Sequence, residues 1–405
     1  MTETRKCPIH DLEALTTSPT MAADYLALRS EAEGATVLSG KKLADTAYWA
    51  IIDYDLIRKA AVDTTAFPSG PGITIPPLRT PIPLIPAEKD PPDHIGYRKL
   101  LVPELRPERM ASWADFIRRS VDHEIDQFIE AGEGDLGAVG RFVPPAAMSA
   151  ILGVPDDARR LAEITDRLNE TATVGDKEGR DKANLELLQY ADALVTLAEQ
   201  DGGERGDLVA RVSNATIKGE PIGHRNAVGM VITLIIGGLE TTVNGISSML
   251  VLVARHPEVR ARLLADASLI PLVVEESLRI ESPVQMIART IASDMDLGGC
   301  PVKAGDKVGF SLGAAHFDAE KFEEPDVFNI DRTSSVPHLA FGHGIHRCVG
   351  EHLARSEMII SLEQVLKRMP DYEITAEIKP RATIAFNRGV GRVPVKFTPG
   401  ARVLS

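Results

Sequence analysis

The chain has 405 residues, of which 44% are apolar, so it can bury a large core, and its length alone allows two or three domains. The formal net charge of −13 argues against nucleic acid or an anionic membrane surface as a partner. Because the three cysteines are scattered and residues 1–12 are too polar for a signal peptide, we expect no disulfide framework and a reducing, cytoplasmic compartment.

The N-terminal part of the chain predicts a small sheet followed by a long loop. Helical periodicity over residues 22–33 precedes two short segments, 36–38 and 49–52, whose β-branched and aromatic residues are typical of strands. Residues 67–86 contain too many prolines and glycines for a regular element, which predicts an irregular loop. Arg79 in this loop is a candidate partner for an anionic substrate, although exposure to solvent is the commoner state of an arginine.

Residues 90–98 place two basic side chains one helical turn apart. Asp90 precedes two prolines and predicts the start of a helix. On that helix His94 and Arg98 would share a face, where both could reach one anion. A surface pair on an amphipathic helix is the alternative.

The middle of the chain is predicted to be helical, with helices over 111–131, 144–152, 156–169 and 182–200. The next helical pattern, 221–255, is far longer than an ordinary helix and should cross the whole molecule. Its longest apolar run, 228–239, is too short to cross a bilayer and suits a buried helix.

The centre of this long helix carries Gly237 and Gly238, followed by the carboxylate of Glu240 and the hydroxyl of Thr241. Glycine weakens a helix by about 1 kcal/mol per residue. The glycine pair therefore predicts close approach of a ligand, with tight packing against another helix as the alternative.

Two charged residues on the following helix, Glu276 and Arg279, lie three positions apart and can interact there. In isolation this spacing is weak evidence for any function. Strand-like segments at 307–312 and 383–386 complete the predicted sheet region.

The segment from Phe341 to Gly350 combines three glycines with Cys348, and a helical pattern follows from about Val349. A thiolate at the N-terminus of a helix is stabilised by free N–H groups, which lowers the cysteine pKa. Such a thiolate can be a nucleophile, a metal ligand or an inert buried group. Zinc bound with nearby histidines is disfavoured because the chain has no paired C-x-x-C.

The whole loop resembles the haem-binding loop of the cytochrome P450 family at every signature position: Phe341, Gly342, Gly344, His346, Cys348 and Gly350. The resemblance covers most of the chain and implies one domain, 1–405. The fold would be mainly α with small β-sheets (α+β), with a long central helix over the haem and the cysteine loop beneath it. The β-rich regions would lie near 35–65, 285–312 and 375–400.

The resemblance implies haem b (iron protoporphyrin IX) as the cofactor. Cys348 would be the thiolate ligand of the iron, a ligand that favours O–O cleavage, and Phe341 would pack beside its sulfur. Glu240 and Thr241 would deliver protons to bound oxygen. Four basic side chains would bind the haem propionates: His94, Arg98, Arg289 and His346.

Two further sets of residues follow from the same resemblance. The substrate pocket, covered by the proline-rich loop, would be lined by Thr233, Ile236, Gly237, Val284, Gln285 and Ile287. A buried charged network under the haem would contain Glu276, Arg279 and Arg332. Loss of one of these residues would leave the charge of the others uncompensated.

By this resemblance the protein is a soluble bacterial-type monooxygenase that inserts one atom of O2 into a mid-sized, neutral, hydrophobic substrate by hydroxylation, epoxidation or O-dealkylation. Electrons would come from NAD(P)H through ferredoxin reductase and ferredoxin, which would dock near Lys99, Arg347 and Arg355. A peroxide-driven peroxygenase and a non-catalytic haem-thiolate binding or sensing protein are the alternatives. The Glu240-Thr241 pair favours the monooxygenase over both.

Overall fold

The computed structural model describes residues 7–43, 45–77, 81–173, 176–202, 204–332, 336–382 and 386–404. The α-helices are α1 Leu12–Thr17, α2 Met21–Glu31, α3 Tyr54–Val62, α4 His94–Leu105, α5 Pro107–Asp126, α6 Gly137–Ile151, α7 Ala158–Thr173, α8 Lys177–Gln200, α9 Leu208–Ser213, α10 His224–Arg255, α11 Pro257–Ala265, α12 Ile270–Ile280, α13 Leu312–His316 and α14 Glu351–Arg368. Short 3-10 helices occupy Pro155–Asp157 (η1), Ala267–Leu269 (η2) and Gly344–His346 (η3).

The strands are short: β1 Ile9–His10, β2 Val37–Leu43, β3 Thr46–Ile51, β4 Glu133–Asp135, β5 Thr216–Ile217, β6 Glu220–Pro221, β7 Ile287–Thr290, β8 Met295–Leu297, β9 Cys300–Val302, β10 Lys307–Phe310, β11 Glu373–Ile374, β12 Pro380–Ala382, β13 Arg388–Val390 and β14 Pro394–Lys396. Helices thus predominate and the sheets are small. The predicted fold class, mainly α with small β-sheets, is confirmed.

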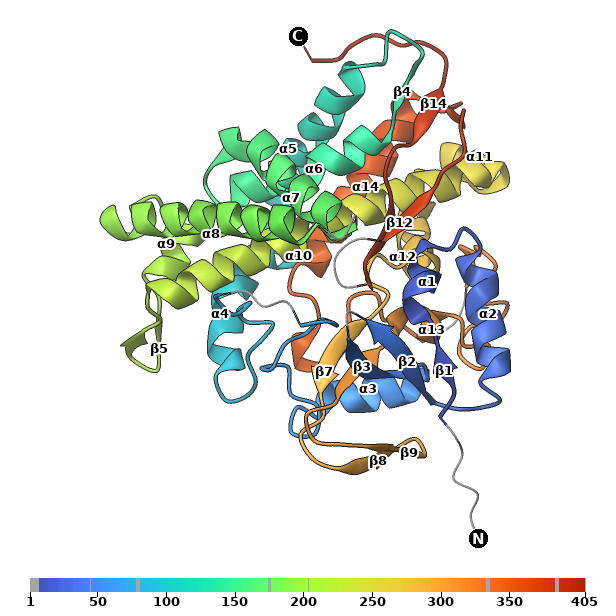
Figure 1. The fold of residues 1–405 in the computed structure, drawn as a ribbon. Coiled ribbons are helices and arrows are strands. Elements are labelled where there is room, and N and C mark those ends of the chain that lie inside the picture. The colour runs from blue at the N-terminus through green and yellow to red at the C-terminus, as the bar shows by residue number, and fades with distance from the viewer. Residues whose placement is uncertain are drawn as a thin grey trace.

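Most of the long helices gather on one side of the molecule, and the first strands lie on the other (Figure 1). Helix α10 crosses the helical side and packs against α6, α8, α12 and α14. Most of its residues are buried, above all in the C-terminal half, because apolar side chains occupy most of its circumference. This confirms the predicted long central helix, although it begins at His224 because β6 occupies the preceding residues.

The largest sheet has the strand order β1-β2-β3-β10-β7. Strand β10 is parallel to β3 and antiparallel to β7, which places Val308 opposite Arg289 and Phe310 opposite Ile287. Because side chains alternate along a strand, Arg289 and Ile287 share one face of β7. The sheet therefore presents both residues toward the loop that precedes α14.

Several predicted boundaries moved. Helix α6 begins at Gly137 rather than at Pro144, because Pro144 and Pro145 lie inside the helix and not in its first turn. Helix α4 begins at His94 with Asp93 as its N-cap, whereas Asp90 accepts hydrogen bonds from Ser69 and Gly70. The strand predicted over 383–386 lies largely outside the described residues.

The expectation about the cysteines was wrong. Cys7 and Cys300 form a disulfide, with their Cα atoms 6.0 Å apart. The two residues are 293 positions apart in sequence, and only the pairing of β1 with β2 and the β8–β9 hairpin beside it bring them together. Sequence spacing carries no signal for such a contact.

Within the described part of the chain, α10 is the one helix that is long and apolar enough to span a membrane, and 61% of its most apolar window is buried inside the protein. Burial to that extent is typical of the core helix of a folded domain.

Candidate functional site

The cysteine loop, residues 341–350, is folded back on itself. The Cys348 backbone N–H donates to the Phe341 carbonyl at 2.9 Å. Gly344 has a φ of +73°, and a Cβ atom there would lie 2.5 Å from the Ala61 carbonyl oxygen. Only glycine allows this approach, so the loop lies directly on α3.

Cys348 lies three residues before the first residue of α14, whose N-cap is Gly350. Its side chain is exposed, yet protein atoms surround it, and this burial raises the pKa of the thiol, while a hydrogen bond from the Gly350 N–H acts in the opposite direction. Both properties fit a side chain that lines an internal space. The predicted lowering of the Cys348 pKa was therefore wrong for the metal-free chain, because desolvation outweighs the helix N-terminus.

Four basic side chains, from α4, β7 and the cysteine loop, surround one small region. His94 is 1% exposed, and its ring centre lies 4.5 Å from that of His346. Arg289 is 4% exposed, and its Nη1 donates to the Ala288 carbonyl at 2.7 Å. Arg98, one turn after His94, has no carboxylate partner among the described residues, and its charge acts on Cys348.

The charges in this cluster are not balanced. Both ring nitrogens of His94 are buried without a hydrogen-bond partner in the described part of the chain. Desolvation, together with the Arg289 and His94 charges, lowers the pKa of His346 to about 3, and burial lowers that of Arg289 to about 10. Asp90 lies 4.0 Å from His346 and already accepts bonds from Ser69.

An anion is the missing partner of this cluster, because buried donors and cations are normally hydrogen-bonded or paired. A haem carries two carboxylates and an iron that binds thiolate. Four donors beside a free thiol therefore fit that cofactor. The fit rests on the unpartnered nitrogens of His94 and on the burial of Arg289.

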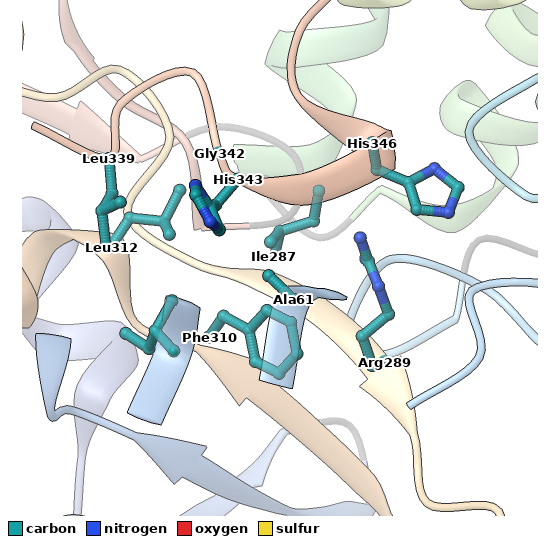
Figure 2. A pocket seen from close by; sticks show the side chains of 10 residues that line it. Ala61, Ile287, Arg289, Phe310, Leu312, Leu339, Gly342, His343 and His346 are labelled. Carbon is teal, nitrogen blue, oxygen red and sulfur yellow. The ribbon is translucent and has the colours of Figure 1, made fainter. Parts of the chain in front are cut away.

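A cavity lies between the cysteine loop, α3 and the β7–β10 pair (Figure 2). Arg289 and His346 stand at one end of it, with the guanidinium directed toward the imidazole. Ile287, Phe310, Leu312 and Leu339 contribute apolar walls, and His343 of the cysteine loop adds a polar one. Two polar hydrogen-bond donors thus sit beside apolar surface.

One stripe of α10 is accessible although most of the helix is buried: Thr233, Ile236, Gly237 and Thr241. Their spacing of three, one and four residues puts them on one face. The Thr241 hydroxyl donates to the Gly237 carbonyl at 2.7 Å, and Thr233 donates to Gly229 at 2.8 Å. Among the described residues, no atom outside the adjacent turns of α10 lies within 4 Å of a Cβ built at Gly237, so the helix is open there.

Glu240 is 4% exposed and faces a different space from Thr241. Its Oε2 accepts from the Asn387 amide at 3.4 Å, and its Oε1 has no partner among the described residues. Burial raises the pKa of Glu240 to about 7. The side chain lines a second cavity, which it shares with Arg141, Asp166 and Arg381. The acid and the hydroxyl are therefore neighbours in sequence that face different sides of α10.

The predicted pocket residue Gln285 does not face this space. It is 1% exposed; its Oε1 accepts from the Tyr25 hydroxyl at 2.8 Å, and its Nε2 donates to the Ser282 carbonyl at 2.5 Å. Val284 and Ile287 remain partly accessible. Adjacent residues of an extended segment point to opposite sides, so Gln285 turns toward α2 while Val284 does not.

The charged network under the cysteine loop is present as a set of contacts. Glu276 pairs with Arg279 at 2.8 Å and with Arg332 at 2.9 Å, and Glu276 and Arg279 are buried. Arg279 also donates to the carbonyls of His316 and Pro325. These bonds join α12 to the segment that leads to the cysteine loop.

Sequence reasoning missed a second charged network beside the loop. Arg355 donates to Glu275 and Glu351, and Arg347 donates to Glu351 as well. The i, i+4 spacing of these residues around Glu351 was a visible signal. Glu275 lies 80 positions from Arg355, and nothing in the local sequence connects the two. The substrate candidate Arg79 lies outside the described residues.

Comparison with known proteins gives a consistent family. Residues 196–370 match the family model Cytochrome P450. Cytochrome P450 107B1 of Saccharopolyspora erythraea is 33% identical over 77% of this chain and 76% of its own length. The steroid C26-monooxygenase of Mycolicibacterium smegmatis is 32% identical over 78% of this chain and 80% of its own.

Solved structures agree with these relatives. CYP108D1 of Novosphingobium aromaticivorans has a TM-score of 0.82 at 28% identity and covers 96% of both chains. CYP109E1 of Bacillus megaterium, in complex with testosterone, also has a TM-score of 0.82, at 29% identity, over 96% of this chain and 100% of that chain. With a cysteine loop, an accessible stripe on a long central helix and these relatives, the chain belongs to the cytochrome P450 family, whose members are haem-iron monooxygenases.

Proposed function

We propose that the protein is a haem b monooxygenase that uses Cys348 as the iron ligand and hydroxylates a mid-sized, neutral, hydrophobic substrate with electrons from a ferredoxin. The observation that carries the proposal is the cluster of four basic side chains beside the accessible thiol of Cys348, in which both ring nitrogens of His94 lack a partner among the described residues: His94, Arg98, Arg289 and His346. These donors would bind the two propionates.

Bound haem iron with a thiolate ligand supplies reductive activation of O2 and insertion of one oxygen atom into the substrate. The protein's own groups supply protons. The pKa of Glu240 near 7 lets its carboxyl gain and lose a proton at neutral pH. The Thr241 hydroxyl, oriented by the Gly237 carbonyl, holds a proton on the accessible face of α10. A small turn of the Glu240 side chain would connect the two faces.

The accessible surface around the site is almost entirely apolar. Ile236, Val284 and Ile287 contribute hydrocarbon, while the hydroxyl proton of Thr233 is already donated to Gly229. With Gln285 turned away, the lone pairs of Thr233 are the hydrogen-bonding group that the described pocket residues offer to a substrate, apart from the Thr241 hydroxyl. This supports a neutral hydrophobic substrate, one that donates a single hydrogen bond. A screen for ligands that shift the haem spectrum from low spin to high spin is expected to select alcohols or phenols over their methyl ethers.

Electron supply by ferredoxin and its reductase is supported by the surface near the cysteine loop. Lys99 is exposed, with no ion-pair partner among the residues described, and lies one position after Arg98. Exposed Ile95 and Val102 flank it on α4. Arg347 and Arg355 are paired with carboxylates, so their charge is largely compensated. An acidic partner would therefore meet Lys99 first.

The test of the proposed function is optical. The reduced protein with carbon monoxide is expected to show the strongly red-shifted Soret band of a thiolate-bound haem, and Cys348→Ser is expected to lose it. Cys7→Ser breaks the disulfide to Cys300 but leaves Cys348 in place, and this control should keep the band. A Cys348→Ser spectrum identical to that of the parent would contradict the assignment.

A second measurement separates the monooxygenase from its alternatives. With surrogate ferredoxin and reductase, NADH consumption is expected to accompany product formation from a ligand found in the screen. Product formed only on addition of peroxide would identify a peroxygenase instead, and absence of product under both conditions would identify a non-catalytic haem protein.

A further inference from the structure

We propose that Arg355 is a positioning residue that fixes the surroundings of the Cys348 sulfur and thereby raises the reduction potential of the iron. The inference rests on the proposed function, since it requires Cys348 to be the iron ligand. It follows from three sets of contacts that one guanidinium makes, to α12, to α14 and to the cysteine loop.

The first contacts are two carboxylates on different helices. Arg355 Nε and Nη2 donate to Glu275 of α12 at 2.6 and 3.0 Å, and Nη1 donates to Glu351 at 2.7 Å. Burial alone would raise the pKa of Glu275, but hydrogen bonds from His338 and Arg355 outweigh it and lower that pKa to about 2. The pKa of Glu351 is lowered to about 2 in the same way by Arg347 and Arg355. Both carboxylates are therefore charged whenever the protein is folded.

The second contact is aromatic. The guanidinium carbon of Arg355 lies 4.4 Å from the centre of the Phe341 ring, a cation–π distance. Phe341 is also the residue whose carbonyl accepts the Cys348 backbone N–H. By holding this ring, Arg355 fixes the beginning of the loop and one hydrogen bond of the cysteine itself.

The contact with Glu351 also acts on the end of the loop. Glu351 is the first residue of α14, and it follows Gly350, whose N–H is directed at the Cys348 thiol. An N–H donor to a thiolate withdraws electron density from sulfur and favours the reduced metal. Arg355 anchors Glu351 and so keeps this donor in place. One side chain thus controls both partners of Cys348.

A lysine cannot make these contacts. Its ammonium is a point charge with no planar fork, so it cannot bridge two carboxylates and lie flat on a ring at once. Removing the cation altogether leaves Glu275 and Glu351 less compensated near the sulfur. Added negative potential and a looser N–H donor both favour ferric iron, so the two effects have the same direction.

The experiment is a mediator titration of the haem-loaded protein. Arg355→Met is expected to lower the ratio of ferrous to ferric protein at a fixed ambient potential about tenfold, which for one electron is about 59 mV. Arg355→Lys is expected to produce a smaller shift in the same direction. If Arg355→Met binds haem too poorly to titrate, Arg355→Lys provides the measurement.

Arg347→Met is the matched control. Arg347 pairs with the same Glu351 but has no contact with Glu275 or Phe341. Because its charge acts on Cys348 as well, Arg347→Met is expected to shift the ratio in the same direction but clearly less than the tenfold change expected of Arg355→Met. An equal shift in Arg347→Met and Arg355→Met would show a general charge effect and overturn the positioning role.

Thermal unfolding of the same variants separates positioning from simple stability. A lower unfolding temperature with an unmoved potential in Arg355→Met and Arg355→Lys would overturn this inference alone. A parent protein that lacks the red-shifted Soret band would instead overturn the proposed function. The two failures are thus distinguishable.

Discussion

The two sides of the site differ in whether their acidic side chains are paired with basic ones. Beside the cysteine loop, Glu275, Glu276 and Glu351 are each bound by two basic side chains. On α10, Glu240 has one weak amide contact and a pKa raised to about 7 by burial. Paired charges hold geometry, whereas an unpaired acid can exchange a proton. The loop side is therefore built for fixed position, and the α10 side for change of protonation.

The largest expected effect comes from removing a buried basic side chain near the cysteine loop. Arg279 is 2% exposed and binds Glu276 together with three backbone carbonyls. Arg279→Met leaves the buried Glu276 with Arg332 as its one basic partner and three carbonyls without this donor, so the free energy of unfolding in urea should fall by about 3–5 kcal/mol. The exposed pair of Arg262 and Asp331 is the control, and Arg262→Gln should cost far less because water screens both charges. Equal losses would show that burial of the pair is unimportant.

Next in size is the loss of a proton donor on the accessible face. Thr241→Ala is expected to keep substrate binding and NADH use but to lower product per NADH by roughly 10²-fold, with hydrogen peroxide in its place. Thr242→Ala removes a buried hydroxyl from the next position, on a different face of α10, and should leave coupling intact. Full coupling in Thr241→Ala would refute its role.

A smaller effect concerns how the stability of the protein depends on pH through Glu240. The Glu240 carboxyl keeps its proton up to a pKa of about 7 in the folded protein but loses it near 4.5 when unfolded. The folded state thus binds more protons between these values, and stability must fall as pH rises through that window. Glu240→Gln should abolish this fall and be more stable than the parent at pH 8, by up to about 3 kcal/mol, with no difference near pH 4.

Urea titrations at pH 4 and pH 8, at matched haem content, measure this difference. Glu163→Gln, a change at an exposed position of α7, is the control and should leave the pH dependence unaltered. If Glu240→Gln showed the same pH dependence as the parent, Glu240 would have to ionise in the folded protein much as it does in the unfolded chain.

The smallest effect concerns Lys99, an exposed residue of α4. Lys99→Glu is expected to weaken the apparent affinity for an acidic ferredoxin a few-fold at low salt, with the difference vanishing at high salt. Lys367→Glu, at the opposite end of α14 from Cys348, controls for net charge. Identical affinities for the parent and Lys99→Glu at low salt would remove Lys99 from the docking surface.

What the sequence could predict was local. Helix α10, the cysteine loop and the turn-spaced pair of His94 and Arg98 all follow from patterns within a few tens of residues. The orientation of Gln285 could not be predicted, since a one-residue change of face depends on the packing of α2. The pKa of Cys348 also required the fold, because desolvation by distant segments exceeds the effect of the nearby helix.

Contacts between residues far apart in sequence also could not be predicted from local patterns. The Glu351–Arg355 contact has helical spacing and was visible in the sequence, but Glu275 meets Arg355 only because α12 packs against α14. The network of Glu276 with Arg332 was inferred from a family resemblance rather than from the residues themselves. The family resemblance thus predicted contacts that helical and strand periodicity could not.

The Cys7–Cys300 bond divides the chain into a covalent ring and a tail. His94, Glu240 and Arg289 lie within the ring, whereas the cysteine loop and α14 lie in the tail. A force applied to the two termini would therefore extend only the residues outside the ring, about 110 of them, to roughly 390 Å at full extension. Once the bond is reduced, the same pull would extend the whole chain, to about 1,400 Å. Mechanical extension of the oxidised protein can therefore reach the iron-ligand loop and α14 but not α10, which lies inside the ring.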